Sequence, residues 1–204
     1  MAASFIAGAL AGFAIAIPVG AIAVLIVELG IRRGFRVAAA AGAGAAAADG
    51  LYATLAVIGG TAIAVILEPL ERPMRIVAIG ALLGIGLRGL VLSLLVQRGD
   101  ARARLFPEQP LGMFGRFLGL TLLNPATVIY FAALILAVPD LGSGPGERAA
   151  FVAGAFLASL SWQTTLAGIS AVAHRRLPAR FQIGVSLLGN LAICGFALLL
   201  ASGL

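Results

Sequence analysis

A single aspartate, Asp49, lies in a run of small apolar residues, AAAAGAGAAAADG. In the middle of a bilayer a carboxylate costs about 2.5 to 3.5 kcal/mol on insertion scales, so an acid at that depth is a functional candidate by default. Such a group could take up a proton or bind an ammonium group. Alternatively, Asp49 forms a structural ion pair with Arg88. Arg88 could also hold a substrate carboxylate or extend to the membrane surface.

Two prolines interrupt apolar runs where backbone groups could become exposed. Pro18 lies in GALAGFAIAIPVG and Pro125 lies in GRFLGLTLLNPAT. A proline lacks an N–H and displaces the carbonyl four residues earlier, and in hydrocarbon the freed groups must find partners or line a cavity. Gly20 and Asn124 lie beside the two breaks, and the Asn124 amide can both donate and accept hydrogen bonds. The breaks therefore predict a site for a polar solute, with a packing kink as the alternative.

A polar cluster interrupts another apolar run near its middle. Trp162 has Ser159 and Gln163 close by, although tryptophan in membrane proteins is enriched at the interfaces. A tryptophan at mid-span indicates a cavity wall, with interhelix packing as the alternative. Glu28 and Arg32 are four residues apart at a predicted helix end, where we expect a solvated ion pair.

These residues need a scaffold that spans a bilayer, and the composition indicates one. Hydrophobic residues make up 61% of the 204 residues and charged residues 11%, and the mean hydropathy is +1.10. Soluble domains are roughly 45 to 50% apolar and about 25% charged. A helix needs about 20 mostly apolar residues to cross the hydrocarbon. Windows of that length predict an all-α integral membrane protein with six transmembrane helices: Phe5–Leu29, Ala38–Leu67, Met74–Val96, Met113–Val138, Ala149–Ala173 and Phe181–Leu200.

The two proline segments are spaced as a repeat. Each has a Gly-x-x-x-Gly pair before its proline, and the copies are offset by 107 residues. Three helices in each half place the second half upside down, so we predict one transmembrane domain over 1–204 with inverted repeats at 1–96 and 111–204. Interrupted helices at matching places of such repeats indicate a transporter's binding site near mid-membrane. The rise per residue puts Pro18, Asp49 and Pro125 at one level, roughly 16 to 18 Å above the cytoplasmic ends of their helices.

Arginines are distributed unevenly between the loops. Cytoplasmic loops carry an excess of Lys and Arg, so both termini should face away from the cytoplasm. The net charge of +6 then needs no nucleic-acid partner, because this orientation and the anionic inner leaflet account for it. Nine arginines lie in loops predicted to be cytoplasmic (Arg32, Arg33, Arg36, Arg98, Arg102, Arg104, Arg175, Arg176 and Arg180) and three on the other side (Arg72, Arg75 and Arg148).

The sequence does not indicate catalysis or metal binding. Cys194 is the only cysteine, which excludes a CxxC pair and an internal disulfide. Asp49 has no second membrane aspartate to form the pair of an intramembrane aspartyl protease. The one histidine, His174, lies beside two arginines at a predicted helix end, where we expect it to be solvated. We therefore expect no enzyme, no cofactor and no metal site.

The runs IPVGAIAVLIVELGIRRGF, AAADG and LLNPATVIYFAAL resemble the LysE/RhtB type (lysine exporter) family of amino-acid efflux proteins. The likeness spans nearly the whole chain. Members are small six-helix proteins with a Pro-Gly-Pro or Pro-Leu-Gly-Pro element in helix one, an Asn-Pro in helix four and, in some branches, an acid in helix two. The resemblance maps these elements onto Pro18 with Gly20, Asn124 with Pro125, and Asp49, although the second proline of the first element is absent here.

The resemblance implies a multi-pass secondary transporter of the inner (plasma) membrane. Its expected partners are a second copy in a homodimer, the lipid bilayer and a small-molecule substrate. It would export amino acids or similar small solutes, driven by the proton gradient. Two alternatives stay open, an exporter of another small solute or cation and a non-transporting membrane subunit. A single acid without cysteine or histidine ligands argues against a selective soft-metal site. The predicted substrate or coupling residues are Asp49, Pro18, Gly20, Asn124, Pro125, Arg88 and Trp162.

Overall fold

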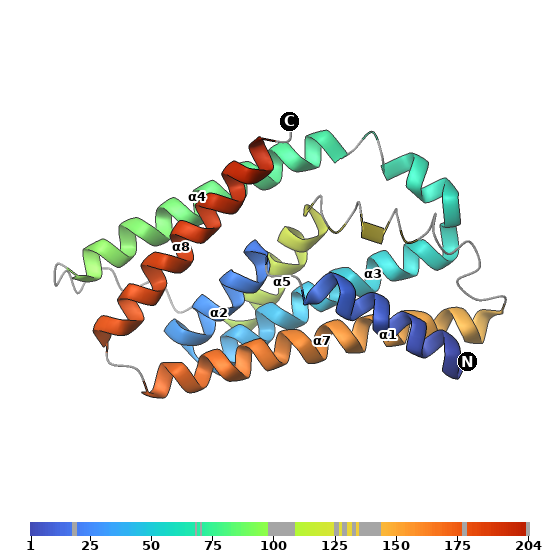
Figure 1. Cartoon of the computed structure of the whole chain (residues 1–204), viewed down its shortest axis with the longest axis horizontal. Coiled ribbons are helices and arrows are strands. Elements are labelled where there is room, and N and C mark those ends of the chain that lie inside the picture. Colours follow the sequence, from blue (N-terminus) through green and yellow to red (C-terminus); the bar gives the residue numbers. More distant parts are fainter. Residues whose placement is uncertain are drawn as a thin grey trace.

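The structure is a computed structural model of the chain. It describes residues 1–17, 20–67, 69, 71–97, 109–124, 127, 130, 131, 134, 144–176 and 179–202. The elements within these ranges are all helices, as the sequence predicts. Their bounds are α1 Ala2–Ala16, α2 Ala21–Arg33, α3 Phe35–Leu67, α4 Glu71–Gln97, α5 Pro110–Leu122, α7 Pro145–Arg176 and α8 Ala179–Ala201 (Figure 1).

Three of the described helices, α3, α4 and α7, are long and apolar enough to cross a membrane. The number rises to four if α1 and α2 form one bent span, and α8 contains a shorter apolar stretch, Leu187–Leu199. The all-α membrane class is therefore confirmed. Most of the predicted fourth span beyond Leu122 lies outside the described residues, so the six-span count and the inverted repeat stay predictions.

The predicted first span, Phe5–Leu29, consists of two helices, α1 and α2, which are bent by 77° relative to each other. Pro18 lies between them but outside the described residues. Gly20 precedes α2 with extended backbone (φ −125°, ψ −176°). At the other end of α2, Gly34 has a φ of 82°, a conformation that favours glycine because it has no Cβ. Gly34 is the one residue between α2 and α3, and the chain turns there from one helix to the next.

Helix α7 packs extensively against other helices. α1 and α3 pack along α7, α5 packs on α3, and α2 contacts α3, α7 and α8. Helices α4 and α8 pack on each other as a second group (Figure 1). The C-terminal ends of α2, α4 and α7 lie toward one end of the molecule, and the N-terminus lies toward the other (Figure 1).

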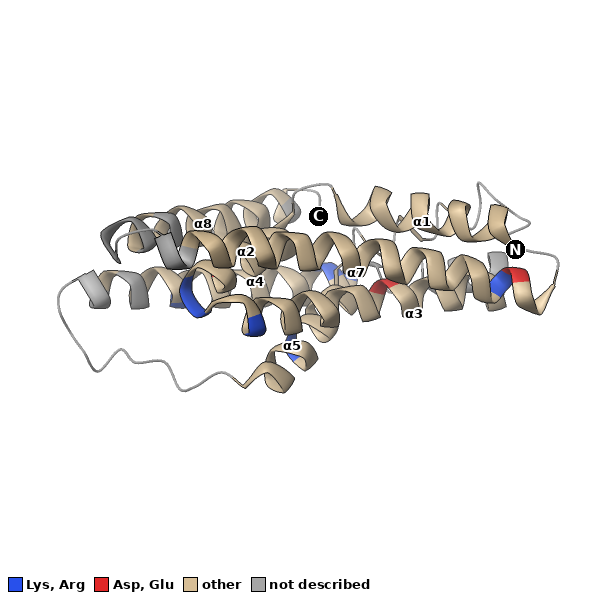
Figure 2. Ribbon diagram, turned by 90° about the horizontal axis from the view of Figure 1, so that it is seen from below, with Lys and Arg blue, Asp and Glu red and all other residues tan. Residues whose placement is uncertain are grey.

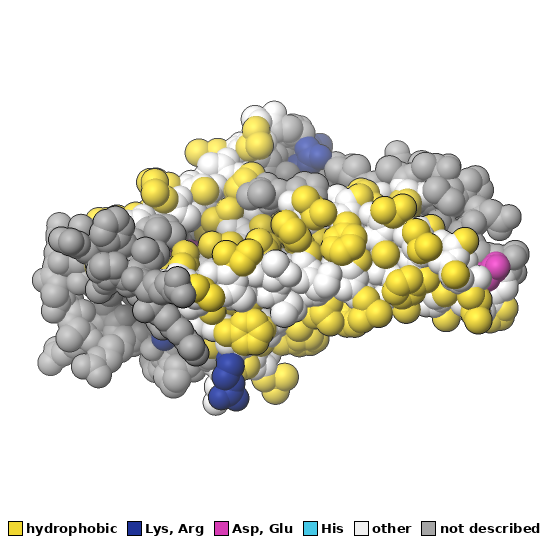
Figure 3. Space-filling model, turned by 60° about the horizontal axis from the view of Figure 1, so that its bottom comes forward, with side chains coloured by type: hydrophobic (Ala, Val, Ile, Leu, Met, Phe, Trp, Pro, Cys, Tyr) yellow, Lys and Arg dark blue, Asp and Glu magenta, His cyan; other side chains and the backbone are white. Residues whose placement is uncertain are grey.

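The outward faces of the helices are apolar, as a lipid environment requires. Figure 2 shows that charged residues are sparse along the described helices, and Figure 3 shows hydrophobic side chains spread along one face of the molecule. Large side chains that would be costly in water are exposed on separate helices, among them Leu10, Ile58, Val91, Ile169 and Leu198. In a bilayer these side chains contact lipid tails.

The Gly-x-x-x-Gly pair of α1 allows close contact with α7, whereas the matching pair of α5 does not make such a contact. A Cβ at Gly12 would collide with the backbone of Ala155, but no described atom lies within 4 Å of a Cβ added at Gly119. In the contact between α3 and α5, the glycine that allows close approach lies on α3 and not on α5. A Cβ at Gly44 would collide with the backbone of Phe114. Small residues let transmembrane helices approach closely, so both contacts depend on glycine.

We predict that Gly12→Ala lowers the thermal stability of the detergent-purified protein, because the new methyl group has no room against α7. Overpacking costs about 1 to 3 kcal/mol. The matched control is Gly119→Ala at the corresponding place of the predicted repeat, where the helix gains up to about 1 kcal/mol from the replacement of glycine. Thermal unfolding followed by circular dichroism measures both variants. Equal Tm values for the two would contradict the α1–α7 packing.

Candidate functional site

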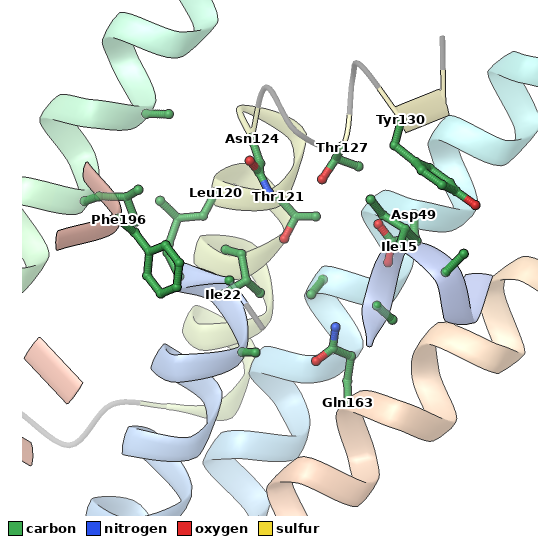
Figure 4. Close-up of a pocket in the computed structure, with 18 of the residues that line it drawn as sticks. Ile15, Ile22, Asp49, Leu120, Thr121, Asn124, Thr127, Tyr130, Gln163 and Phe196 are labelled. Carbon is green, nitrogen blue, oxygen red and sulfur yellow. The ribbon is translucent and has the colours of Figure 1, made fainter. Parts of the chain in front are cut away.

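A cavity of about 520 Å³ lies where the helices are interrupted, and all seven described helices contribute to its wall. Its volume falls within the roughly 300 to 1,000 Å³ of small-molecule sites. Most of the lining is apolar, from alanine, leucine, isoleucine and phenylalanine side chains. The polar side chains that line this central cavity are those of Asp49, Thr121, Asn124, Thr127, Tyr130 and Gln163 (Figure 4).

The break between α1 and α2 forms one wall of the central cavity. Ile15 and Ala16, at the end of α1, line the cavity together with Gly20, Ala21 and Ile22 at the start of α2. The first four N–H groups of a helix have no partner within the helix, so the first turn of α2 brings backbone donors to the cavity wall. The structure therefore places Gly20, one of the predicted site residues, at the wall of the central cavity.

The second interruption, at the end of α5, lies across the same cavity. α5 ends at Leu122, and the chain then turns: the Asn124 N–H donates to the Thr121 carbonyl at 3.1 Å, and the Thr127 N–H donates to the Asn124 carbonyl at 3.0 Å. Asn124 and Thr127 both line the cavity. Pro125 lies outside the described residues. The Asn-Pro segment thus brings side chains to the cavity that a continuous helix would direct elsewhere.

Asp49 is buried in the middle of α3, with 3% of its surface exposed. The Ser159 hydroxyl on α7 donates a hydrogen bond to its Oδ2 at 2.6 Å. Burial of a carboxyl group is costly unless it is hydrogen-bonded, so Ser159 stabilises this acid inside the bundle. The carboxyl group still faces the cavity (Figure 4), where it is available to a bound solute or a proton.

Two polar atoms at the cavity wall are buried without a hydrogen-bond partner among the described residues, Thr121 Oγ1 and Gln163 Oε1. Each such group in a folded protein needs a physical reason, because an unsatisfied buried polar atom costs about 1 to 3 kcal/mol. In Figure 4 both side chains point into the space faced by Asp49 and Asn124. A polar solute or water in the cavity would satisfy both atoms.

Two tyrosines near the central cavity form hydrogen bonds between separate segments of the chain. The Tyr52 hydroxyl donates to the Leu122 carbonyl at 2.6 Å, at the end of α5, and the Tyr130 hydroxyl donates to the Ala11 carbonyl at 2.8 Å. Phe131 stacks on Tyr52 with ring centroids 5.7 Å apart and meets Tyr130 edge to face at 5.3 Å. The aromatic cluster therefore links α1 and α3 to the chain around the second interruption.

Two predicted site residues lie elsewhere. Arg88 is an exposed residue of α4 that lines a separate cavity, and no ion pair joins it to Asp49. Trp162 is next to Gln163 on α7, but its side chain does not line the central cavity; its indole N–H is buried without a partner in the described part of the chain. The polar cluster around Trp162 did indicate a cavity wall, formed by Gln163.

Glu28 and Arg32 form the expected ion pair. The prediction that this pair is solvated is wrong, because Glu28 is buried, with 8% of its surface exposed. Its Oε1 accepts hydrogen bonds from Arg32 Nη1 at 3.1 Å and from Asn190 Nδ2 at 2.6 Å. The spacing of Glu28 and Arg32 predicts their pairing, but no local pattern connects them to Asn190 on α8.

In the described part of the chain, no three His, Cys, Asp or Glu side chains lie together as metal ligands would.

A cavity with a group of polar side chains at interrupted helices, inside a bundle with an apolar surface, defines a membrane transport protein. The chain belongs to the LysE type translocator family, whose family model matches residues 13–203. Members of this family are transporters and not enzymes, so the resemblance stated from the sequence is confirmed.

Two curated relatives are similar to this chain. The chemotactic transduction protein ChpE of Pseudomonas aeruginosa is 31% identical over 169 residues, which cover 79% of each chain. YggA of Aeromonas salmonicida, whose name designates it provisionally as an amino-acid transporter, is 43% identical over 89 residues, or 42% of each chain. No solved structure matches this chain.

We predict that Ser159→Ala destabilises the protein by about 1 to 3 kcal/mol, because it leaves the buried Asp49 carboxyl without its partner. Ser161→Ala is the matched control: Ser161 is exposed and its hydroxyl bonds only to a carbonyl of its own helix, so its loss should change stability by less than about 0.5 kcal/mol. Denaturation in detergent measures both. In Asp49→Ala/Ser159→Ala, the loss should be smaller than the sum of the single losses; an additive result would contradict the interaction.

Proposed function

We propose that this protein is a secondary transporter that exports amino acids or similar small solutes across the plasma membrane, coupled to the proton gradient. The central cavity is the substrate site. The observation that carries this proposal is the grouping, at two helix interruptions, of a buried carboxyl group with two unpartnered polar atoms, those of Thr121 and Gln163.

The wall of the central cavity offers complementary groups for a zwitterion. The Asp49 carboxylate can bind an ammonium group, and the first turn of α2 presents N–H groups with the positive end of the helix dipole, which favour an anionic group. The Asn124 and Gln163 side chains can bond to either end of a polar solute. Apolar lining from Ile15, Ile22 and neighbouring residues suits the carbon chain of an amino acid.

Proton coupling rests on Asp49. Export against a gradient needs an energy source, and this chain contains no lysine among its 14 basic residues, so it has no P-loop of the type that binds nucleotides. A proton and the ammonium group of the substrate would compete for the Asp49 carboxylate. A proton arriving from outside would displace the substrate to the outside, and substrate arriving from the cytoplasm would displace the proton into the cytoplasm. Export of substrate is then coupled to proton entry.

The packing of the helices supports two inverted halves. In the predicted repeat, α1 of the first half corresponds to α5 of the second half, α3 to α7, and α4 to α8. The α1–α7 contact then has an equivalent in the observed α5–α3 contact, and the α3–α7 and α4–α8 contacts are each their own equivalent. A two-fold axis in the membrane plane has this effect. For the homodimer, the supporting feature is the open Gly80 and Gly84 face of α4, where no described atom lies within 4 Å of an added Cβ.

We predict that Asp49→Asn abolishes amino-acid accumulation driven by a pH gradient in proteoliposomes, by at least about tenfold, because the amide keeps the shape of the side chain but cannot take up a proton. Exchange of labelled for unlabelled substrate should persist at a reduced rate. The substrate is first chosen by a thermal-shift screen of the amino acids, since a ligand of the folded state raises Tm. The control is Glu147→Gln, a partly exposed carboxylate near the N-terminus. An unchanged rate and pH dependence in Asp49→Asn would refute the coupling role.

The orientation of the chain is a separate proposal. The basic ends of α2 and α7 lie toward one end of the molecule (Figure 1), and we place that end in the cytoplasm because arginine accumulates there. In a Cys194→Ser background, Pro145→Cys should react with a membrane-impermeant thiol reagent on intact cells. Arg36→Cys, an exposed position at the opposite end of the bundle, should react only after the cells are opened. The reverse pattern would invert the orientation.

A further inference from the structure

A second cavity, of about 160 Å³, lies between α2, α4, α5 and α8. It adjoins the central cavity, because Leu120 lines both and α2 supplies Ile22 to one and Leu25 to the other. We call it the arginine cavity. Its charged lining consists of one carboxylate, Glu28, and four guanidinium groups, Arg32, Arg33, Arg88 and Arg116.

Glu28 already has its partners inside this cavity. Arg32 and Asn190 both donate hydrogen bonds to its Oε1, and Asn190 itself is 1% exposed. Arg32 therefore pairs with the one carboxylate of the lining, and Arg33 and Arg88 add positive charge to the cavity. The pairing also shows that a carboxylate fits at this level of the bundle between a guanidinium and a side-chain amide.

Arg33 and Arg88 have no hydrogen bond or ion pair with any residue in the described ranges. Arg33 is half-buried at the end of α2, and Arg88 reaches the cavity from α4. Guanidinium groups bind carboxylates and phosphates through paired, charge-assisted hydrogen bonds. The cavity thus combines a positive potential with two donors that have no partner among the residues that the structure describes.

We propose that the arginine cavity binds the carboxylate group of the substrate before the substrate passes Leu120 into the central cavity. The amino-acid identity of this ligand rests on the proposed function. Glu28 keeps the binding moderate, because its negative charge opposes a second anion and a site on a transport path must also release what it binds. The apolar wall formed by Leu29, Ile85 and Phe117 excludes water from one side of the guanidinium groups, which strengthens their electrostatic attraction.

A lipid headgroup phosphate offers similar chemistry to a substrate carboxylate. Two features favour the substrate. The arginine cavity adjoins the central cavity at the shared Leu120, and on the α8 side the lining presents the Asn190 amide, bonded to Glu28, and not a further cation. The two sources separate experimentally, because lipid composition can be changed independently of the soluble ligand.

The test measures occupancy of the arginine cavity directly. Leu29→Cys in the Cys194→Ser background places one thiol at the cavity wall. The protein is reconstituted into phosphatidylcholine nanodiscs, and the rate of reaction with a small anionic thiosulfonate is measured with each of the twenty L-amino acids and with its carboxamide. We expect at least one amino acid to slow the reaction in a saturable way, whereas its carboxamide has little effect.

Three variants identify the groups responsible for protection. Arg33→Gln and Arg88→Gln should each raise the concentration needed for protection by roughly tenfold or more, the effect of losing a charged hydrogen bond. Arg36→Gln removes the same charge from an exposed position that lines neither cavity and should leave protection unchanged. Asp49→Asn should also preserve it, since that side chain lies in the central cavity. Protection in Asp49→Asn together with an unchanged rate and pH dependence of transport would refute the proposed coupling role while supporting the arginine cavity.

Two results would overturn the proposal. If no amino acid protects the thiol but anionic phosphatidylglycerol in the nanodisc does, the cavity is a lipid headgroup site. If Arg36→Gln weakens protection as much as Arg33→Gln and Arg88→Gln do, the effect is a general surface potential and not a binding site.

Discussion

A helix interrupted inside a bilayer frees backbone groups that lipid cannot hydrogen-bond, and this constraint governs the structure around the cavity. The interruptions between α1 and α2 and at the end of α5 face each other across one cavity, so the freed groups there border the cavity instead of contacting hydrocarbon. Tyr52 satisfies one such group by donating to the Leu122 carbonyl. Thr121 Oγ1 and Gln163 Oε1, which have no partner among the described residues, are available to whatever occupies the cavity.

Two apolar clusters hold the interruptions in place. One contains Ala53, Phe131 and Ala155 and packs around the α1 side of the cavity; the other contains Ile26, Phe117 and Ile193 and packs around the α2 side. Lipid does not drive helices together by the hydrophobic effect, so close contact depends on small residues, and the contact of α1 with α7 through Gly12 and Ala155 is of this kind. The cavity therefore lies between two packed regions that can move relative to each other only if these contacts rearrange.

The sequence predicts the main parts of the site because their chemistry is conspicuous in a membrane. Asp49, Gly20 and Asn124 lie at the central cavity, as an acid or a chain break in an apolar run would suggest. The sequence does not predict which way each helix turns its polar residues, since small and apolar residues surround them on all sides and give little amphipathic pattern. For that reason the Asp49–Ser159 and Glu28–Asn190 contacts, which join distant segments, are known only from the structure. The ion pair of Asp49 with Arg88, one alternative from the sequence, does not form, because Arg88 lines the arginine cavity.

The two cavities differ in charge, and this difference bears on selectivity. The central cavity has one acid, Asp49, whereas the arginine cavity has an excess of guanidinium groups. In the proposed scheme an amine would be repelled at the arginine cavity, and a simple carboxylic acid would meet Asp49 without an ammonium group to offer it. A solute with both charges interacts favourably at each level in turn. Selectivity for zwitterions would then arise from the order of two electrostatic environments along α2, and neither cavity alone would need to distinguish an amino acid from other small polar solutes.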